Sequence, residues 1–363
     1  MNSTNIILLD PTFESSDLIT EIETLYKYLN LYLVHTNTNK TNQNLLPNQN
    51  NCYISNCSDH ALVTAVQMNN DQRLMRPALI SKHKELQRSI LLDHRKVRHP
   101  ASLVIEPSTT QSSIKAWFQA NESESYIVKP ESSSGSQGAS KTSSHCESLA
   151  YLPFAQSHSP NGKVLIESLI FGEHYIVDVI GDDMIVGKKN KSSDLILTSS
   201  IIFEKLTESY REHIGARLIE ACKEIIDKFG FNPALKVTAE FICAADGSLY
   251  LIEAANRGAG VNISSKIFSA IFKKNTERLF LLNWLNFFGF DTSWSSSTIQ
   301  PPEVSSTQKI LLEYVNADHG NDVELSDCLF YQALKNTDDK SPRTGVFNFD
   351  YVKASWIKDE FTH

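Results

Sequence analysis

The sequence predicts an α+β fold built from two or three subdomains. The chain has 363 residues, which is too long for one compact core. It opens with a strand–helix–strand pattern, which is typical of a small parallel unit. Further on, residues 235–255 alternate around the turn ADG as a β-hairpin does. The sequence leaves the order of the strands open.

The composition is that of an ordinary soluble globular protein, with 41% hydrophobic and 21% charged residues. The net charge is −8, and the lysines and arginines form no cluster, so we expect neither a nucleic-acid-binding nor a membrane-binding protein. No run of about 18 apolar residues predicts a transmembrane helix. The N-terminus lacks the basic start of a signal peptide, and the six cysteines are scattered, so we expect reduced thiols and a cytoplasmic protein.

The first expected unit, residues 1–77, begins with a buried strand at 6–10. A helical pattern follows in SDLITEIETLYKYL, and a second strand occupies 31–35. The Asn-rich segment 36–51 predicts a loop, and SDHALVTAVQM predicts a short helix. We therefore expect a small α/β subdomain here.

The second expected unit, residues 78–168, starts with a helix in LISKHKELQRSILLDHRKVRHP, capped by Ser81 and ending near Pro100. SLVIEP then predicts a strand, and STTQSSIKAWFQAN predicts a helix capped by Ser108. SYIVKP, residues 125–130, is a strand that leads into a Ser/Gly-rich loop. This unit combines linking helices with a candidate lid.

The third expected unit, residues 169–363, is rich in strands. EHYIVDVI and DMIVGKK predict neighbouring strands, and a long amphipathic helix follows and ends at Gly230. LKVTAEFICA and SLYLIEAA form the expected hairpin, and the next segment is helical. The last 70 residues hold two strand candidates, KILLEYV and GVFNFDYV, and no chemical signature.

The Ser/Gly-rich loop ESSSGSQGASK is a candidate phosphate-binding segment. Backbone N–H groups without bulky side chains can wrap a phosphate, and serine hydroxyls add donors. Lys129, at the end of the preceding strand, adds a positive charge nearby. The loop matches neither the P-loop nor the dinucleotide-binding glycine pattern, so a plain surface loop is the alternative. The candidate residues are Ser133, Ser134, Gly135, Ser136 and Gly138.

The hairpin places two carboxylates near each other. Glu240 lies within VTAEFIC, and Glu253 lies on the returning strand within YLIEAA. Two carboxylates that are buried together lose their charge or need a cation. Mg²⁺ prefers one or two carboxylates together with phosphate oxygens, so the pair predicts a metal site. The alternative is two strand residues that face solvent.

In order along the chain, these pieces resemble the ATP-grasp superfamily. YIVKPESSSGSQGASK is similar to its strand–Lys–Pro–Gly-rich loop, VLIESLIFGEHYIVDV to its hinge strand, and VTAEFICAADGSLYLIEAANRGAG to its metal-binding hairpin. The resemblance covers about residues 77 to 290 and is nearest to the carboxylate–amine ligases. It implies an ATP-grasp fold with a small N-terminal α/β subdomain, a lid subdomain and a C-terminal antiparallel-sheet subdomain.

The resemblance also implies which residues bind ATP. Lys82, in SKHKELQRSIL, and Lys129 would contact the phosphates, and the loop Ser133–Gly138 would close over them. Glu167 would face the amino group of adenine. The remaining base contacts would come from the backbone of Ser168 and Ile170.

Other matching residues would serve the metal and the reaction. Glu240 and Glu253 would hold Mg²⁺ or Mn²⁺, and Arg257 would stabilise the transferring phosphoryl group or an acyl phosphate. Two positions depart from the family pattern. His174 stands where a ribose-binding Glu is usual, with Glu173 one residue early. Asn256 stands one residue later than the usual metal-binding Asn, where a regular strand would turn it to the other face unless a bulge intervenes.

The resemblance implies an ATP-dependent carboxylate–amine ligase that forms an amide through an acyl phosphate. Its partners would be a small carboxylic acid and an amino-acid-like amine, and a homodimer is common in the family. Two alternatives remain open. One is other phosphoryl-transfer chemistry on the same fold, of the kinase or carboxyphosphate type. The other is a nucleotide-binding regulator without turnover.

Overall fold

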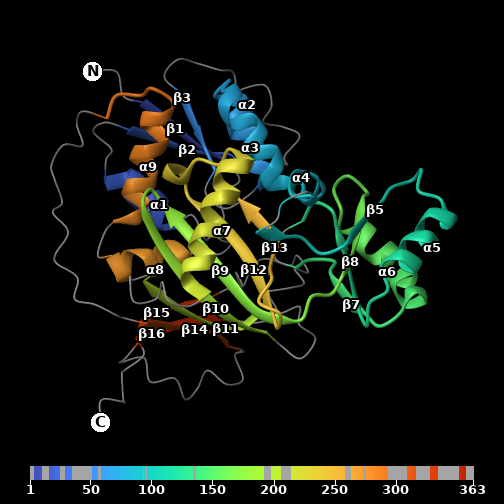
Figure 1. Ribbon diagram of the computed structural model, residues 1–363. Coiled ribbons are helices and arrows are strands. Elements are labelled where there is room, and N and C mark those ends of the chain that lie inside the picture. Colours follow the sequence, from blue (N-terminus) through green and yellow to red (C-terminus); the bar gives the residue numbers. More distant parts are fainter. Residues whose placement is uncertain are drawn as a thin grey trace, which may run out of the picture.

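In the part of the chain that it describes, the computed structural model contains three β-sheets with helices packed against them (Figure 1). This arrangement confirms the α+β class. The described residues are 4–9, 16–24, 29–34, 51–55, 59–92, 94, 96–133, 136–191, 198–205, 214–257, 263–272, 275–292, 309–315, 328–333 and 351–356.

The first sheet is parallel and has the order β2-β1-β3. Its strands are β1 (Thr4–Leu9), β2 (Leu29–Val34) and β3 (Asn51–Ile54), accompanied by α1 (Ser16–Thr24) and α2 (Asp59–Met68). The predicted strand–helix–strand unit is therefore confirmed. β3 was not predicted, because its short apolar run directly follows a long polar segment.

A helix from far along the chain completes the core of this first unit. Side chains of α9 (Thr276–Phe287) pack into the cluster formed by β1, β3 and α2. Trp284 is fully buried there, and its indole N–H donates a hydrogen bond of 2.9 Å to the Tyr53 carbonyl, 231 residues away in sequence. Figure 1 shows α9 beside the first sheet. The core of this unit thus includes residues outside the expected range 1–77.

The second sheet is antiparallel, with the order β5-β8-β6-β7. Two helices, α5 (Gln111–Ala120) and α6 (His145–Ser157), supply the apolar residues that cover it. Thr110, rather than the expected Ser108, caps α5. The strands are β5 (Ser102–Ile105), β6 (Tyr126–Pro130), β7 (Ser140–Thr142) and β8 (Val164–Ser168).

The third sheet has nine strands in the order β15-β16-β14-β11-β10-β9-β12-β13-β4. The amphipathic helix α7 (Ile214–Phe229) packs on one face and forms the main core with β9, β12 and β13. The opposite face carries the polar residues described below. The strands are β4 (Val97–Arg98), β9 (Gly172–Ile180), β10 (Asp183–Lys191), β11 (Thr198–Lys205), β12 (Val237–Ala244), β13 (Leu249–Ala255), β14 (Lys309–Val315), β15 (Cys328–Ala333) and β16 (Tyr351–Trp356).

The single helix expected around Ser81 is in fact two helices. α3 (Gln72–Lys82) is capped by Asp71, and α4 (Lys84–Ile90) follows after a break at His83, whose backbone is extended. Ser81 lies inside α3 and donates a hydrogen bond to the carbonyl of Pro77, so it is not the cap. α4 also ends well before Pro100. The break matters because it separates Lys82 from Lys84.

Two further findings concern the described residues as a whole. None of their helices combines the length and the apolar character that crossing a bilayer would require. The described cysteines include four free thiols, of which those of Cys52 and Cys222 are buried.

Candidate active site

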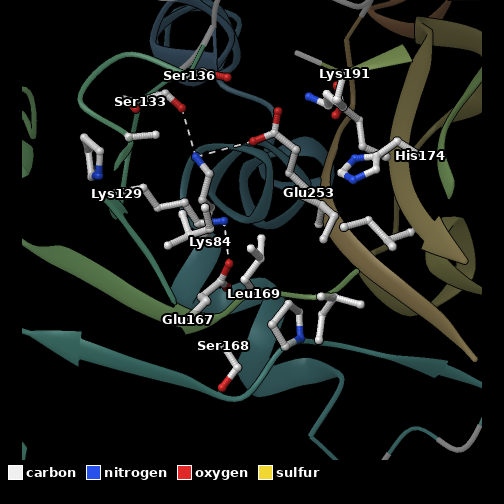
Figure 2. Close-up of a pocket in the computed structure, with 18 of the residues that line it drawn as sticks. Lys84, Lys129, Ser133, Ser136, Glu167, Ser168, Leu169, His174, Lys191 and Glu253 are labelled. Carbon is white, nitrogen blue, oxygen red and sulfur yellow. Dashed lines mark hydrogen bonds and ion pairs between the residues drawn. The ribbon is translucent and has the colours of Figure 1, made fainter. Parts of the chain in front are cut away.

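The candidate active site is a cavity between the second and third sheets (Figure 2). One wall comes from β6, β8 and the loop after β6, and the other comes from β9, β10, β12 and β13. Helix α4 contributes a lysine between the two walls. Polar and charged residues in the lining are Lys84, Lys129, Ser133, Ser136, Gln137, Glu167, Ser168, His174, Lys191, Glu240 and Glu253.

Glu240 and Glu253 lie opposite each other in the register of β12 and β13, as the hairpin predicted. The register shifts directly beside them, since Phe241 pairs with Leu251 and Ile252 is the extra residue of a β-bulge. Leu251 and Ala254 both pack in the core on the α7 side. The bulge therefore reverses the alternation of β13 and turns Glu253 to the cavity.

Cations surround both carboxylates. The ammonium of Lys84 lies 3.5 Å from a carboxylate oxygen of Glu253, and Lys189 forms an ion pair with Glu240. Loss of water raises the pKa of Glu253, but the charges of Lys84 and Lys129 outweigh this effect and hold the pKa below its usual range. Glu253 therefore stays an anionic carboxylate inside the cavity.

The donor set fits a divalent cation shared with phosphates. Among the described residues, no group of three or more acidic, His or Cys side chains could hold a metal by itself. Two carboxylates beside several lysines instead match Mg²⁺, which usually combines one or two carboxylates with phosphate oxygens. A cation at Glu240 and Glu253 would therefore need oxygen atoms from a bound molecule.

Helix α4 places its polar residues toward the cavity and toward β13. Lys84 donates a hydrogen bond of 2.9 Å to the carbonyl of Ser133, at the start of the Ser/Gly-rich loop. Gln87 is fully buried and bonds both the N–H and the carbonyl of Ala254. Sequence reasoning missed Lys84, Gln87 and Arg88, although their spacing of three and four residues indicates one helix face.

Lys82 does not reach the cavity. Its ammonium lies 3.4 Å from a ring nitrogen of His60 on α2, beyond the break at His83. The expectation that Lys82 reaches the phosphate-binding cavity is therefore corrected, because Lys84 lines the cavity and Lys82 does not. Lys191 on β10 was also missed and lines the opposite wall.

The loop after β6 borders the cavity through Ser133 and Ser136. Ser134 and Gly135 lie outside the described residues. Gly138 has a φ of +73°, and a Cβ there would lie 2.7 Å from Cβ of His158, so only glycine fits without rearrangement. The end of the loop is thus fixed against α6.

The hinge segment also lines the cavity, with Glu167, Ser168, Leu169 and Ile170. The N–H of Ser168 donates to the carbonyl of Ala101, and the N–H of Leu169 donates to that of Ser125, each at 2.9 Å. These bonds hold the segment in place. The Glu167 carboxylate is almost fully buried between the ammonium of Lys129, 2.6 Å away, and Nε of Arg88, 2.8 Å away. Its expected contact with the amino group of adenine is therefore corrected, because both carboxylate oxygens are bound to cations.

Of the two candidates for a ribose contact, the structure brings His174 to the cavity. Burial, together with the charge of Lys191, lowers the pKa of His174 to about 4, so its ring is neutral at pH 7. Glu173 instead points elsewhere: it pairs with Lys188 and accepts a hydrogen bond of 2.6 Å from the hydroxyl of Tyr175.

Asn256 does not join the two carboxylates, and its expected metal role is corrected. The bulge lies before Glu253, so Asn256 shares the other face of β13 with Ala254. Its side-chain oxygen accepts from the N–H of Asn232 at 2.7 Å, and its amide nitrogen donates to the carbonyls of Asn232 and Lys236. The side chain therefore joins β13 to the turn before β12.

Arg257, at the end of β13, is held by Asp59 at the start of α2. Two hydrogen bonds of 2.8 and 2.7 Å join the guanidinium to the carboxylate. The side chain of Arg257 does not line the cavity. Its positive charge nevertheless helps to lower the pKa of Glu253. The Gly-Ala-Gly that follows it lies outside the described residues.

No protein-family model and no curated protein sequence matches this chain. Its structure is similar to that of L-amino acid ligase from Bacillus licheniformis, with a TM-score of 0.71 and 13% identity over 98% of this chain and 94% of the other. It is also similar to an N5-carboxyaminoimidazole ribonucleotide synthetase in complex with ADP (TM-score 0.67, 10% identity, 98% and 92% covered). A D-Ala:D-Ser ligase from Enterococcus faecalis matches with a TM-score of 0.56 and 13% identity, over 79% of this chain and 100% of the other. The sequence motifs and these likenesses agree, and the chain has the ATP-grasp fold.

Proposed function

We propose that the chain is an ATP-dependent ligase that joins a carboxylic acid to an amine through an acyl phosphate and releases ADP and phosphate. The observation that carries this proposal is the cavity itself, which is lined by the carboxylates of Glu240 and Glu253 and by Lys84 and Lys129. Lys84 pairs there with Glu253, and Lys129 pairs with Glu167. Fixed cations beside paired carboxylates suit the phosphates of a nucleotide and their metal ions.

The residues that line the cavity have separate roles in this proposal. Lys84, Lys129 and Lys191 bind and orient the phosphates, while Glu240 and Glu253 hold Mg²⁺ or Mn²⁺. Such a cation, when bound, neutralises the charge of the phosphate oxygens. Positioning and charge neutralisation are the main needs of phosphoryl transfer.

The segments around the cavity bind the nucleoside and exclude water. The hinge backbone from Ser168 to Ile170 borders the base, and the neutral ring of His174 contacts the ribose. The loop that contains Ser133, Ser136 and Gly138 covers the phosphates. An acyl phosphate hydrolyses readily, so a lid that excludes water protects it. Arg257 stabilises that intermediate from the end of β13.

We propose small, amino-acid-like substrates, because two of the structures similar to this chain are named as an L-amino acid ligase and a D-Ala:D-Ser ligase. We also propose that the enzyme works in the cytoplasm, where thiols such as those of Cys146 and Cys243 stay reduced. A homodimer is the proposed assembly, by analogy with the fold family.

The test is a screen for ADP release over pairs of amino acids with MgATP, with hydroxylamine added to trap an acyl phosphate. ADP and a hydroxamate that depend on one acid, and an amide that depends on the amine, are the expected results. ADP release that needs only one substrate, without amide, would indicate kinase or carboxyphosphate chemistry. Nucleotide binding without turnover for any pair would favour a regulator, as Ala255 in place of a metal ligand also does.

A further inference from the structure

The carboxylate of Glu167 holds two cations at once. One of its oxygens accepts a hydrogen bond of 2.8 Å from Nε of Arg88, and the other lies 2.6 Å from the ammonium of Lys129. The exposed fractions of the side chains are 4% for Glu167, 5% for Arg88 and 12% for Lys129. Figure 2 shows the side chains of Glu167 and Lys129 directed toward each other, with their ion pair as a dashed line.

This cluster keeps Glu167 charged. Burial raises the pKa of Glu167, but the charges of Arg88 and Lys129 lower it to about 2. Burial and the neighbouring cations Arg88 and Lys84 also lower the pKa of Lys129, against the effect of Glu167. A buried carboxylate that loses its last cation is strongly destabilised, because its charge is then uncompensated.

Lys129 therefore has two possible partners, Glu167 and a nucleotide phosphate. Lys129 lines the cavity, so its ammonium can turn toward a bound anion. Arg88 does not line the cavity, and it is anchored by a hydrogen bond of 2.6 Å from Nη2 to the carbonyl of Ile252. When Lys129 turns away from Glu167, Arg88 stays with the carboxylate.

We infer that Arg88 is a positioning residue: it holds the charge of Glu167 so that Lys129 is available to the phosphates of the nucleotide. Without Arg88, Lys129 would be the only cation among the described residues that contacts Glu167, and it could turn away only by leaving that carboxylate without a cation. This inference rests on the nucleotide site of the proposed function, but it does not depend on the ligase reaction.

The test is a double-mutant cycle read by calorimetric binding of MgADP, which needs no turnover. Arg88→Met is expected to weaken MgADP binding about tenfold or more, because Lys129 stays with Glu167. Adding Glu167→Gln removes the anion that retains Lys129, so R88M/E167Q is expected to bind MgADP within about threefold of the wild type. Thermal unfolding establishes that each variant is folded.

A purely structural role of Arg88 gives a different pattern. Gln87→Met removes the neighbouring anchor between α4 and Ala254, and any weakening that it causes should not be relieved by E167Q. If R88M does not fold, Arg88→Lys serves instead: it retains the cation and is expected to keep MgADP binding within about threefold of the wild type.

Three results would overturn the inference: R88M that binds MgADP as the wild type does, R88M/E167Q that binds as weakly as R88M, or R88K that loses binding. A wild-type chain that binds no MgADP overturns it as well, together with the nucleotide site. A wild-type chain that binds MgADP but releases no ADP with any substrate pair contradicts only the proposed ligase reaction.

Discussion

Glu253 faces Glu240 because of a single extra residue, Ile252, in the strand β13. On a regular strand Glu253 would share the face of Leu251 and enter the apolar core. The bulge therefore assigns the side chains at the end of β13: Glu253 to the cavity, Ala254 to the core and Asn256 to the turn before β12.

Glu253→Ala should abolish ADP release while leaving the fold intact. The side chain is partly exposed in the cavity and removing it leaves no apolar void, so the unfolding temperature should change little. The loss of activity would come from the missing anion opposite Glu240. Glu173→Ala is the matched control, because Glu173 lies on β9 but outside the cavity lining. Wild-type turnover in the Glu253 variant would contradict the proposed role of Glu253 in metal binding.

Lys84→Met and Lys82→Met should differ strongly, although the two lysines are only two residues apart. Lys84 contacts Ser133 and Glu253, so its loss should weaken MgATP binding about tenfold or more. Lys82 faces His60, and its loss should leave binding within about twofold. Titration of both variants with MgATP measures the two affinities. An equal loss of affinity in both variants would contradict the placement of Lys84 in the cavity.

Gly138→Ala should destabilise the protein more than Gly181→Ala. Both glycines have a positive φ, so each change costs about 1 kcal/mol through the backbone. At Gly138 the new methyl group would also collide with His158 and Pro130, whereas Gly181 has open space around it. Urea unfolding of the two variants isolates the steric part, and equal values would show that the loop can shift without cost.

Asn256→Ala should lower stability without changing the metal requirement. The amide makes three hydrogen bonds with backbone groups, worth about 1 kcal/mol each, and leaves those groups buried when it is lost. We expect a free energy of unfolding lower by about 2–4 kcal/mol. The Mg²⁺ concentration that gives half-maximal ADP release should stay the same, and a large shift in it would restore Asn256 as a ligand.

Asp178→Asn should change how stability depends on pH. Asp178 is buried on β9, accepts a hydrogen bond from Thr238, and its other oxygen has no partner among the described residues. Burial raises its pKa to about 7. Between pH 4 and 7 the folded state therefore holds a proton that the unfolded state has released, so this residue makes stability fall as pH rises.

The difference in unfolding free energy between the wild type and D178N measures this effect, since the other titrating groups are shared. It should decline from pH 4 to pH 7 with a slope of up to about 1.4 kcal/mol per pH unit. A difference that stays constant over this range would show that Asp178 titrates normally.

The hairpin and its two carboxylates could be predicted because alternation and a short turn are local signals. The bulge could not, since the run Leu-Tyr-Leu-Ile-Glu carries no glycine or other mark of an extra residue. Its position is set by packing: Leu251 and Ala254 both enter the core against α7. The same alternation places Asn256 on the face of Ala254, away from the two carboxylates.

The break between α3 and α4 was equally hidden in the sequence. No glycine or proline marks it, and the helical pattern continues through it. It is stabilised by Glu131, 48 residues from His83 and fully buried, whose carboxylate accepts from the ring of His83 at 3.0 Å and from the N–H of Glu85 at 3.2 Å. Contacts between residues so far apart in sequence lie beyond local patterns, so Lys84 was overlooked.

The ammonium of Lys84 links the loop after β6 to Glu253, one of the two carboxylates proposed to bind a metal. One donor serves both the carbonyl of Ser133 and the carboxylate of Glu253. A displacement of the loop that removes Ser133 frees that donor, and the electrostatic potential at Glu253 changes with it. If Glu253 binds a cation as proposed, displacement of the loop and affinity for that cation would be reciprocally coupled, so each could report on the other.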